Sequence, residues 1–374
     1  MQIFFFIHSL DAGGAERVTI NLANYWADMG WKITIVSMME HQNDFFVLHP
    51  NIQRIGLSLD SDSQNLLTAI YNNWNRTRTM RRLLRQFRPD VAVGVMTTTN
   101  CLLSLAAVGL RLIVIGSEHT HPPASPLGWM WESLRSMTYR HLAAVVALTI
   151  SSAEWLRMNT HAKRIRVIPN PIGYPLPEHE PQVPPNRDAT SGCNYRLLAV
   201  GRLAHEKGFD FLLDVFAGLA KRFPEWELII LGEGPLRREL EAQTEILGIA
   251  NRVRMPGAVG NIGTWYGWAD LYVMTSRYEG FGNTLAEALA YGLPAVSVDC
   301  ETGPRSILRH GIDGLLVPIN DVPAISHALE LLMSNSALRE QFALRAVEAR
   351  ERFAIDKVAV QWEAVFEECS RGPS

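Results

Sequence analysis

Short apolar runs alternate with helix-compatible segments along nearly the whole chain, and this rhythm occurs twice. In the first half the runs are residues 3–7, 33–38, 91–96, 112–116 and 144–148. In the second half they are residues 196–200, 227–231, 252–255, 271–275, 294–298 and 315–318. Continuous apolar runs separated by ten or more helix-compatible residues are typical of buried parallel strands. We therefore predict an α/β protein with two doubly wound, Rossmann-like domains that face each other across a cleft.

A proline-rich, polar stretch lies between the two halves. It begins at Pro169-Asn-Pro171 and contains five further prolines up to Pro185. This composition predicts a linker. A length of 374 residues also fits two domains better than a single core. We expect an N-terminal domain over residues 1–175, a C-terminal domain over 190–352, and a last helical segment over 353–374.

Composition and charge exclude several classes of protein. The chain is 47% hydrophobic and 20% charged, which is typical of a folded domain, and its net charge of -3 gives no field that would favour nucleic acid. The apolar start, residues 1–7, is too short for a signal peptide, and Arg111 interrupts the most apolar stretch, residues 102–116. The four cysteines and the His, Asp and Glu residues lack metal-ligand spacing, so we expect reduced thiols, a cytoplasmic location and no metal.

Two glutamates, Glu279 and Glu287, enclose a glycine turn that follows a predicted strand and opens a helix. Backbone amides at a helix N-terminus, together with the helix dipole, form a site for an anion. We expect the amides of Gly282, Asn283 and Thr284 to bind a phosphate. Carboxylates would repel a phosphate alone, so the ligand should also carry hydroxyl groups, as a ribose or a hexose does.

Two other loops of the second half follow predicted strands. Arg202 and Lys207 come after the run 196–200, where fixed cations would neutralise a diphosphate. The Gly-X-Gly ending at Gly234 is an incomplete dinucleotide fingerprint, because Arg237 replaces the third glycine and no acidic residue closes the next strand. We reject a dehydrogenase and expect this glycine pair to wrap the nucleotide of the ligand.

In the first half, two features also lie at predicted carboxyl ends of strands. Gly13-Gly14 forms a strand-to-helix turn, where backbone amides can approach a ligand closely, although a plain tight turn explains it equally well. His119 follows the run 112–116, and its role is either catalytic or structural. The sequence has no Gly-X-Ser-X-Gly elbow and no Gly-Lys-Ser phosphate loop, which argues against hydrolases and NTPases.

Taken in order, these motifs closely resemble the retaining GT-B glycosyltransferases of family four. The resemblance extends from Gly13-Gly-Ala-Glu-Arg17 through Gly201-Arg-Leu-Ala-His-Glu-Lys207 and the paired glutamates to Phe353 and Gln361-Trp362. Asp299-Cys-Glu-Thr-Gly-Pro304 looks like the branch that builds bacterial lipid-linked oligosaccharides and surface polysaccharides. The resemblance implies transfer of a hexose or N-acetylhexosamine from a UDP-sugar to a lipid-linked saccharide, without metal or other cofactor.

The resemblance also implies a role for each matching residue. Arg202 and Lys207 would bind the diphosphate, and Gly14 would lie under it. Glu279 would contact the transferred hexose, and Glu287 would contact the ribose. His119 would contact the sugar near its anomeric carbon. The last helix would cross back onto the first domain. Two other functions stay open: transfer to a soluble small acceptor, or a non-catalytic subunit that binds a sugar nucleotide.

A basic amphipathic segment, residues 74–88, would explain how such an enzyme reaches a lipid acceptor. It contains Arg76, Arg78, Arg81, Arg82, Arg85 and Arg88, interleaved with Trp74, Met80, Leu83, Leu84 and Phe87. A basic helix of this kind can lie on an anionic lipid surface, so we expect Arg76–Arg88 to contact the inner face of the cytoplasmic membrane. The alternative is a surface helix that packs its apolar residues on its own sheet.

Overall fold

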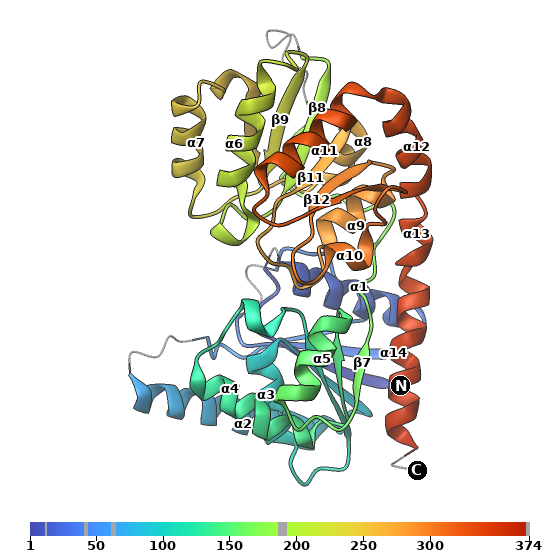
Figure 1. Cartoon of the computed structure of the whole chain (residues 1–374). Helices are drawn as coiled ribbons and strands as arrows, with labels where there is room; N and C mark the ends of the chain where they lie inside the picture. The colour runs from blue at the N-terminus through green and yellow to red at the C-terminus, as the bar shows by residue number, and fades with distance from the viewer. Residues whose placement is uncertain (12, 41–43, 61–64, 186–192, 372–374) are drawn as a thin grey trace. The chain divides into compact units, whose positions relative to one another are not determined.

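The computed structural model describes residues 1–11, 13–40, 44–60, 65–185 and 193–371 (Figure 1). The chain divides into two compact units. Unit 1 consists of Met1–Pro171 together with Ile355–Ser374, and unit 2 consists of Ile172–Ala354. The sequence analysis placed the domain boundaries at residues 175, 190 and 352. The last helix, α14 (Ile355–Ser370), belongs to unit 1 although it follows unit 2 in the chain.

Unit 1 is built on a seven-stranded sheet in the order β3-β2-β1-β4-β5-β6-β7, with every neighbouring pair parallel. The strands are β1 (Gln2–Ile7), β2 (Lys32–Ser37), β3 (Gln53–Gly56), β4 (Val91–Val95), β5 (Ile113–Glu118), β6 (Ala144–Ala147) and β7 (Ile165–Val167). The helices besides α14 are α1 (Gly14–Asp28), α2 (Leu66–Phe87), α3 (Thr97–Ala107), α4 (Trp129–Thr138) and α5 (Ile150–Asn159), with short 3-10 turns η2 (Pro122–Ala124) and η3 (Tyr139–His141).

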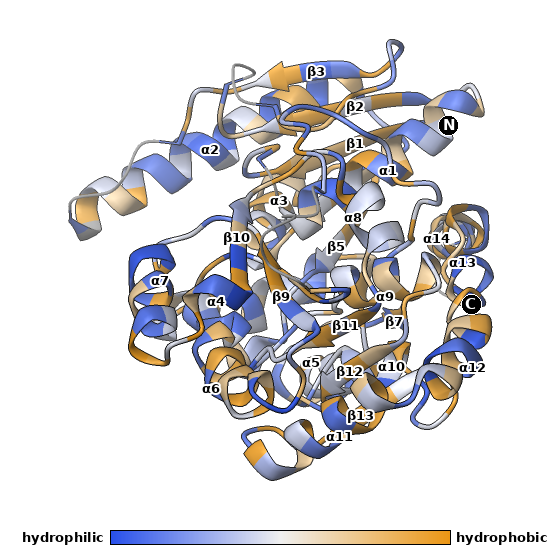
Figure 2. Cartoon of the chain, turned by 90° about the horizontal axis from the view of Figure 1, so that it is seen from above, coloured by the Kyte–Doolittle hydropathy of each residue, from blue (hydrophilic) through white to orange (hydrophobic). Residues whose placement is uncertain are grey.

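Helices cover both faces of this sheet, which is why its central strands are apolar throughout. On one face α1 and α14 pack together: the rings of Trp26 and Phe366 lie 5.5 Å apart, and the Trp26 indole donates a 2.8 Å hydrogen bond to Glu363. On the other face α2, α3 and α5 bury side chains such as Met80 and Leu103. Figure 2 shows hydrophobic residues along the strands.

Unit 2 repeats the design with a six-stranded sheet in the order β10-β9-β8-β11-β12-β13, again parallel. Its strands are β8 (Tyr195–Val200), β9 (Trp226–Leu231), β10 (Val253–Gly257), β11 (Leu271–Met274), β12 (Ala295–Val298) and β13 (Gly314–Val317). Its helices are α6 (Phe209–Ala220), α7 (Arg237–Ile246), α8 (Ile262–Trp268), α9 (Asn283–Ala290), α10 (Pro304–Ile307), α11 (Val322–Ser334), α12 (Ser336–Ala346) and α13 (Ala349–Arg352), with 3-10 turns η4 (His205–Lys207) and η5 (Ala250–Arg252).

The predicted fold class is confirmed: two parallel α/β sheets with the doubly wound strand order. All eleven strands that the sequence predicted are present, with ends that differ by at most two residues. β3 and β7 were not predicted. Among the described residues, none of the helices combines the length and the hydropathy needed to cross a bilayer.

The proline-rich stretch that the sequence analysis interpreted as a linker starts in unit 1, whose first segment ends at Pro171, and its described residues from 172 to 185 belong to unit 2. Its Leu176 is buried, and the Leu176 amide donates a 2.9 Å hydrogen bond to the Tyr291 hydroxyl. Val183 exchanges two hydrogen bonds of 3.0 Å with the Asn261 side chain. Prolines cannot donate to a sheet, but the residues between them do bond, so this segment is fixed along unit 2.

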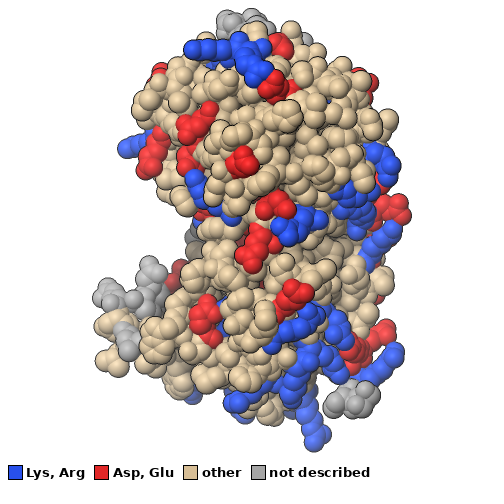
Figure 3. Space-filling view, in the orientation of Figure 1, with Lys and Arg blue, Asp and Glu red and all other residues tan. Residues whose placement is uncertain are grey.

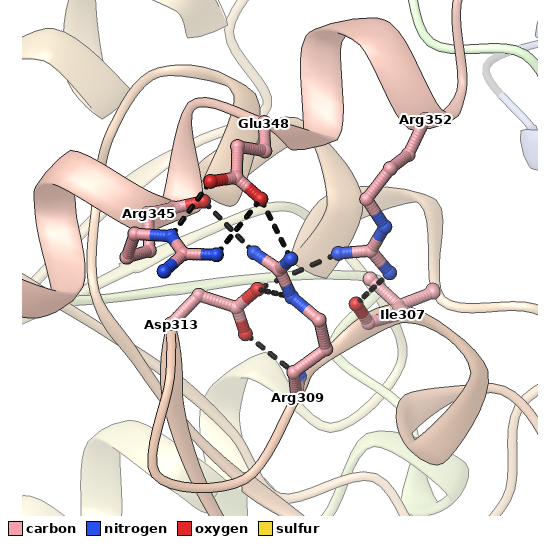
Figure 4. Close-up of polar contacts among 6 residues, drawn as sticks. All are labelled: Ile307, Arg309, Asp313, Arg345, Glu348 and Arg352. Carbon is pink, nitrogen blue, oxygen red and sulfur yellow. Dashed lines mark hydrogen bonds and ion pairs between the residues drawn. The ribbon is translucent and has the colours of Figure 1, made fainter.

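A buried charge network fixes the last turns of unit 2 (Figure 4). The Asp313 side chain is fully buried and accepts hydrogen bonds from Arg309 Nε at 2.6 Å and Arg352 Nη1 at 3.4 Å. Glu348 accepts from Arg309 at 2.7 Å and from Arg345 at 2.6 Å. The network connects the turn before β13 with α12 and α13, far apart in sequence.

Candidate active site

Most of the predicted site residues lie in the loops that follow the strands of unit 2. Arg202 and Lys207 follow β8, Gly234 follows β9, and Glu279 follows β11. Because the carboxyl ends of parallel strands share one edge of the sheet, these loops gather at the edge where open α/β sheets bind their ligands. The structure brings two of the residues into direct contact: Lys207 Nζ lies 2.6 Å from Glu279 Oε1.

This ion pair is shielded and supported by a third side chain. The Lys207 side chain is 20% exposed and that of Glu279 is 10% exposed. Ser276, which is buried, donates a 2.6 Å hydrogen bond to the same Glu279 oxygen. Thr302, from the segment after β12, donates from its hydroxyl to the Glu279 backbone carbonyl. Both the carboxylate and the main chain of Glu279 are therefore positioned before any ligand binds.

The sequence analysis did not identify Ser276. Because its hydroxyl bonds the Glu279 carboxylate, we expect Ser276 to position that carboxylate and to affect the reaction rate. Ser276→Ala should lower kcat about 10- to 100-fold, because a hydrogen bond to a charged group contributes about 1.5–3 kcal/mol. KM for the donor should change little. Ser276→Thr keeps a hydroxyl and should recover most of the rate. Steady-state kinetics of both variants test this, and equal damage from Thr and Ala would show that Ser276 only fills space.

The helix N-terminus predicted to bind a phosphate is present as the start of α9. Gly282 is its N-cap residue, in the left-handed region at φ 104°, which explains the glycine. A glycine cap has no side chain to satisfy the first amides, which is the arrangement that anion sites use. The Thr284 hydroxyl accepts a 2.8 Å hydrogen bond from the Tyr272 hydroxyl of β11, which connects the first turn of α9 to that strand.

Glu287, one turn into α9, is almost completely buried, with 1% of its surface exposed. The Tyr266 hydroxyl donates a 3.1 Å hydrogen bond to Glu287 Oε2. A ribose bound by Glu287 would therefore share this carboxylate with Tyr266. Tyr266 was not identified from the sequence, because it lies on α8, in a segment with no motif.

Arg202 differs from Lys207 in its surroundings. Its side chain is 69% exposed and pairs at 2.6 Å with Glu206, four residues along the chain. An exposed pair of this kind contributes little to stability, so Arg202 can leave Glu206 at small cost. The structure does not bring Arg202 into contact with Glu279 among the hydrogen bonds and ion pairs of the described residues.

The glycines after β9 have a structural explanation. A Cβ on Gly234 would overlap the backbone of Leu203, and one on Gly232, at φ 138°, would overlap the Gly201 carbonyl. The loops after β8 and β9 thus pack backbone against backbone, which only glycine permits. Contact between Gly234 and a nucleotide stays a prediction.

In unit 1, His119 lies directly after β5. Its Nε2 is 2.9 Å from the Ser117 hydroxyl, and its buried Nδ1 has no hydrogen-bond partner among the residues that the structure describes. Burial lowers the pKa of His119 to about 4, so the ring is neutral at pH 7. A neutral imidazole with one unused nitrogen can accept from or donate to a sugar hydroxyl.

At the Gly13-Gly14 turn the structure shows a feature that the sequence did not indicate. α1 begins at Gly14, and a Cβ on Gly13 would overlap the Glu16 carboxylate, so the side chain of Glu16 folds back over the turn. Burial raises the pKa of Glu16. A diphosphate placed at Gly14 would require this carboxylate to move or to be protonated, because like charges repel.

Comparisons with known proteins identify the family. The model for "Glycosyltransferase Family 4" matches residues 12–173, and the model for "Glycosyl transferases group 1" matches residues 189–348. Together the two models span both units. The chain belongs to glycosyltransferase family 4. The family resemblance drawn from the sequence motifs is confirmed, and the chain is a glycosyltransferase. The roles of single site residues remain predictions.

Relatives of this glycosyltransferase include proteins of bacterial polysaccharide synthesis. An exopolysaccharide phosphotransferase of Streptomyces coelicolor is 33% identical over 77% of the chain, which covers 30% of that relative's length. A Campylobacter jejuni α-1,4-N-acetyl-D-galactosaminyltransferase, named for an undecaprenol-diphosphate-linked substrate, is 27% identical over 97% of each chain.

Solved structures of similar fold cover both units of the glycosyltransferase. Sucrose-phosphate synthase from Thermosynechococcus elongatus has a TM-score of 0.84 at 17% identity and full coverage of both chains. Anabaena HepE in complex with UDP and glucose has a TM-score of 0.81 at 18% identity, over 98% of this chain and 99% of that one. At this identity the likeness shows the fold, which is GT-B.

No group of three or more His, Cys, Asp or Glu side chains that could hold a metal ion occurs among the residues that the structure describes. The polar groups that gather at the edge of unit 2 are instead a lysine, a glutamate, a serine and a helix N-terminus. These can bind an anion and hydroxyl groups through charge and hydrogen bonds.

Proposed function

We propose that this glycosyltransferase moves a hexose or N-acetylhexosamine from a UDP-sugar to a lipid-linked saccharide, in the synthesis of a bacterial surface polysaccharide or glycan. The observation that carries the proposal is the Lys207–Glu279 pair, held by Ser276 beside the N-terminus of α9. It combines a cation for a diphosphate with a carboxylate for sugar hydroxyls.

The donor and acceptor classes are supported by relatives. HepE is described in complex with UDP-glucose, and the Campylobacter enzyme is named for an acceptor linked to undecaprenol diphosphate. Other relatives are named for amylovoran biosynthesis and for lipopolysaccharide core biosynthesis. These names support a nucleotide-sugar donor and an acceptor anchored in lipid.

Donor binding would rearrange the Lys207–Glu279 pair. In the structure the two charges neutralise each other at 2.6 Å. A diphosphate that contacts Lys207 would share its charge, leaving the Glu279 carboxylate to accept hydrogen bonds from the hexose hydroxyls. Arg202, released from Glu206, would add a second cation. The pair thus keeps a buried carboxylate neutralised until the donor arrives.

We assign the chemistry as transfer with retention. The bond between the anomeric carbon and the UDP oxygen breaks, and the acceptor hydroxyl oxygen bonds to that carbon from the same face. The acceptor proton passes to the departing phosphate. Lys207 would stabilise the negative charge that grows on the diphosphate, which is an effect on the transition state. His119, neutral at pH 7, would hydrogen-bond a hydroxyl of the sugar near its anomeric carbon.

An acceptor screen tests the proposal. Purified enzyme is incubated with radiolabelled UDP-sugars and native membranes, and label is followed into the lipid-extractable fraction, with Glu279→Gln as the inactive control. We expect transfer that survives EDTA. Label in a water-soluble product would favour a soluble acceptor. UDP binding without any transfer would indicate a non-catalytic subunit, and complete, metal-reversible loss in EDTA would contradict the metal-independent mechanism.

A further inference from the structure

A buried carboxylate that the proposed mechanism does not use lies next to His119 in the chain. Figure 3 shows Lys, Arg, Asp and Glu side chains on the visible surface of unit 1, where water solvates their charges. Glu118, the last residue of β5, is instead buried, with 1% of its surface exposed. Burying a carboxylate is costly unless hydrogen bonds and opposite charges compensate for the lost water. Its partners therefore indicate which parts of unit 1 this carboxylate connects.

Glu118 connects β5 with the elements that precede and follow it in the chain. Its Oε2 accepts a 2.8 Å hydrogen bond from the hydroxyl of Thr97, the first residue of α3. Its Oε1 accepts a hydrogen bond from the hydroxyl of Tyr139, the first residue of η3. The Tyr139 oxygen in turn accepts a 3.2 Å hydrogen bond from Asn100 Nδ2. Both carboxylate oxygens are used, and they join α3, β5 and η3.

A buried cation favours the ionised form of this carboxylate. Burial raises the pKa of Glu118, while the hydrogen bond from Tyr139 and the charge of Arg135 lower it. The Arg135 side chain, on α4, is buried, pairs with Glu132 and lies over the Trp155 ring at 4.5 Å from its centroid. Burial and the Glu118 charge raise the pKa of Tyr139, so the phenol keeps its proton and donates it to the carboxylate in the hydrogen bond.

The turn from β4 into α3, which this network holds, has a strained backbone. Met96 occupies the turn at φ 74° and ψ 151°, a region that residues other than glycine rarely adopt. The Met96 amide donates a 3.0 Å hydrogen bond to the Ser117 carbonyl, and Asn100 Nδ2 donates to the same carbonyl at 3.1 Å. Strained backbone persists only where the surrounding structure fixes it, and it is concentrated at functional sites. The end of β5 is therefore bonded to a turn of this kind.

Glycines on both strands leave room for the Asn100 side chain. A Cβ on Gly94 of β4 would lie 2.6 Å from Asn100 Oδ1, and one on Gly116 of β5 would lie 3.1 Å from Asn100 Cγ. A side chain at Gly94 would displace the amide that bonds Ser117 and Tyr139. The sequence of the two strands thus accommodates the network, which makes a chance contact a poor explanation for it.

The other end of α3 is also fixed. Arg81 of α2 donates hydrogen bonds of 2.7 Å to the carbonyls at the end of α3. The sequence analysis expected Arg81, Arg76 and Phe87 to contact lipid, and the structure corrects this for all three. Arg76 donates a 2.7 Å hydrogen bond to the Leu59 carbonyl, and Phe87 packs on Phe4 with ring centroids 5.4 Å apart. Because its C-terminal end is bonded to α2, α3 can act as a rigid support for the end of β5.

His119 directly follows the residue that this network fixes. Its ring is held by the Ser117 hydroxyl, 2.9 Å from Nε2, and its main chain continues from Glu118. We infer that Glu118 is a positioning residue: by joining the end of β5 to α3 and η3, it holds His119 in place for glycosyl transfer. The inference rests on the proposed function, in which His119 contacts the sugar near its anomeric carbon.

Steady-state kinetics of Glu118→Gln test this positioning. Glutamine keeps the shape but has only one acceptor oxygen, so it cannot accept from Thr97 and Tyr139 as the carboxylate does. We expect kcat to fall about 10- to 100-fold, because a misplacement of about 1 Å in a site can cost about 100-fold in rate. KM for the donor should stay close to that of the wild type. Tyr139→Phe removes a single hydroxyl and should act in the same direction by a smaller factor, which keeps the test valid if Glu118→Gln folds poorly.

A double-mutant cycle with His119→Ala distinguishes positioning from a general effect on the fold. If Glu118 acts through His119, Glu118→Gln should change kcat by less than about twofold in the His119→Ala background. The same loss in both backgrounds would show that Glu118 only supports the fold. Glu363→Gln is the matched control, because Glu363 on α14 accepts a hydrogen bond from Trp26 on the other face of the same sheet. This control should keep the wild-type kcat.

The pKa of His119 provides a readout that needs no activity. Burial lowers this pKa to about 4, so a ring that is released toward water should titrate closer to the ordinary value of about 6.5. Loss of a nearby negative charge would lower the pKa, so a rise in Glu118→Gln would report movement of the ring. NMR titration of protein with 15N-labelled histidine would measure it, with the signal assigned by its absence in His119→Ala. Glu363→Gln should keep the wild-type value.

The outcomes separate this inference from the proposed function. A wild-type enzyme that transfers no sugar to any acceptor would contradict the proposed function, and a raised His119 pKa in Glu118→Gln would still support the positioning. Transfer by the wild type, with an unchanged His119 pKa and an unchanged kcat in Glu118→Gln, would overturn the positioning role and leave the proposed function in place.

Discussion

Replacing Lys207 by Ala is expected to lower kcat by about 30- to 1000-fold, the loss of about 2–4 kcal/mol of transition-state stabilisation typical of one preorganised electrostatic donor. The reason is geometric. Lys207 Nζ is held 2.6 Å from the Glu279 carboxylate at 20% side-chain exposure, so its charge is fixed at the edge where the diphosphate would develop charge. Steady-state kinetics with the UDP-sugar varied would measure the effect, and KM should change less than kcat.

The matched control for this variant is Lys221→Ala. Lys221 is exposed at the end of α6 in the same unit, so its loss removes equal charge away from the site. Its kcat should stay close to that of the wild type. Near-normal turnover in Lys207→Ala would remove Lys207 from the site, and a matching loss in Lys221→Ala would point to long-range charge instead.

The second large effect concerns stability. Asp313→Asn should lower the free energy of unfolding of unit 2 by about 3–5 kcal/mol, the usual loss when one partner of a buried ion pair is removed. The fully buried Asp313 carboxylate neutralises Arg309 and Arg352, and burial already lowers the pKa of Arg352. Without that carboxylate, two guanidinium groups would repel each other. Urea unfolding followed by circular dichroism would measure the loss.

Glu348→Gln serves as the comparison, since Glu348 binds Arg309 and Arg345 at a more exposed position of the same network. Its effect on the urea midpoint should be clearly smaller. Equal midpoints for wild type and Asp313→Asn would mean that the network contributes nothing to the stability of this unit.

The strands could be predicted because burial on both faces makes them continuous apolar runs. Phe4, Phe5 and Phe6 are all buried, since helices cover both faces of β1. β3 and β7 escaped prediction for the opposite reason. They are edge strands of four and three residues, and Gln53-Arg-Ile-Gly56 has neither an apolar run nor a clear alternation.

The site could be predicted only in part. Glu279, Lys207 and Gly282 stand in motifs at strand ends, so the sequence shows them. Ser276, which bonds Glu279, and Tyr266, which bonds Glu287, have no such motif, because a hydrogen bond between two side chains depends on how the chain packs. The two interpretations of α2 also stayed open in the sequence, since its periodicity is the same in the half that packs at Met80 and in the half that is exposed at Trp74.

The position of α14 has a consequence for the order in which the protein is made. Unit 1 begins at Met1, yet its core includes Trp362 and Phe366, which the ribosome adds only after the whole of unit 2. During synthesis the first unit therefore waits, with the apolar face that holds Trp26 uncovered, while the second unit can already fold. Transiently exposed apolar surface of this kind is prone to aggregation. Unit 1 thus leaves the ribosome first, but its core is complete only after α14 has been synthesised.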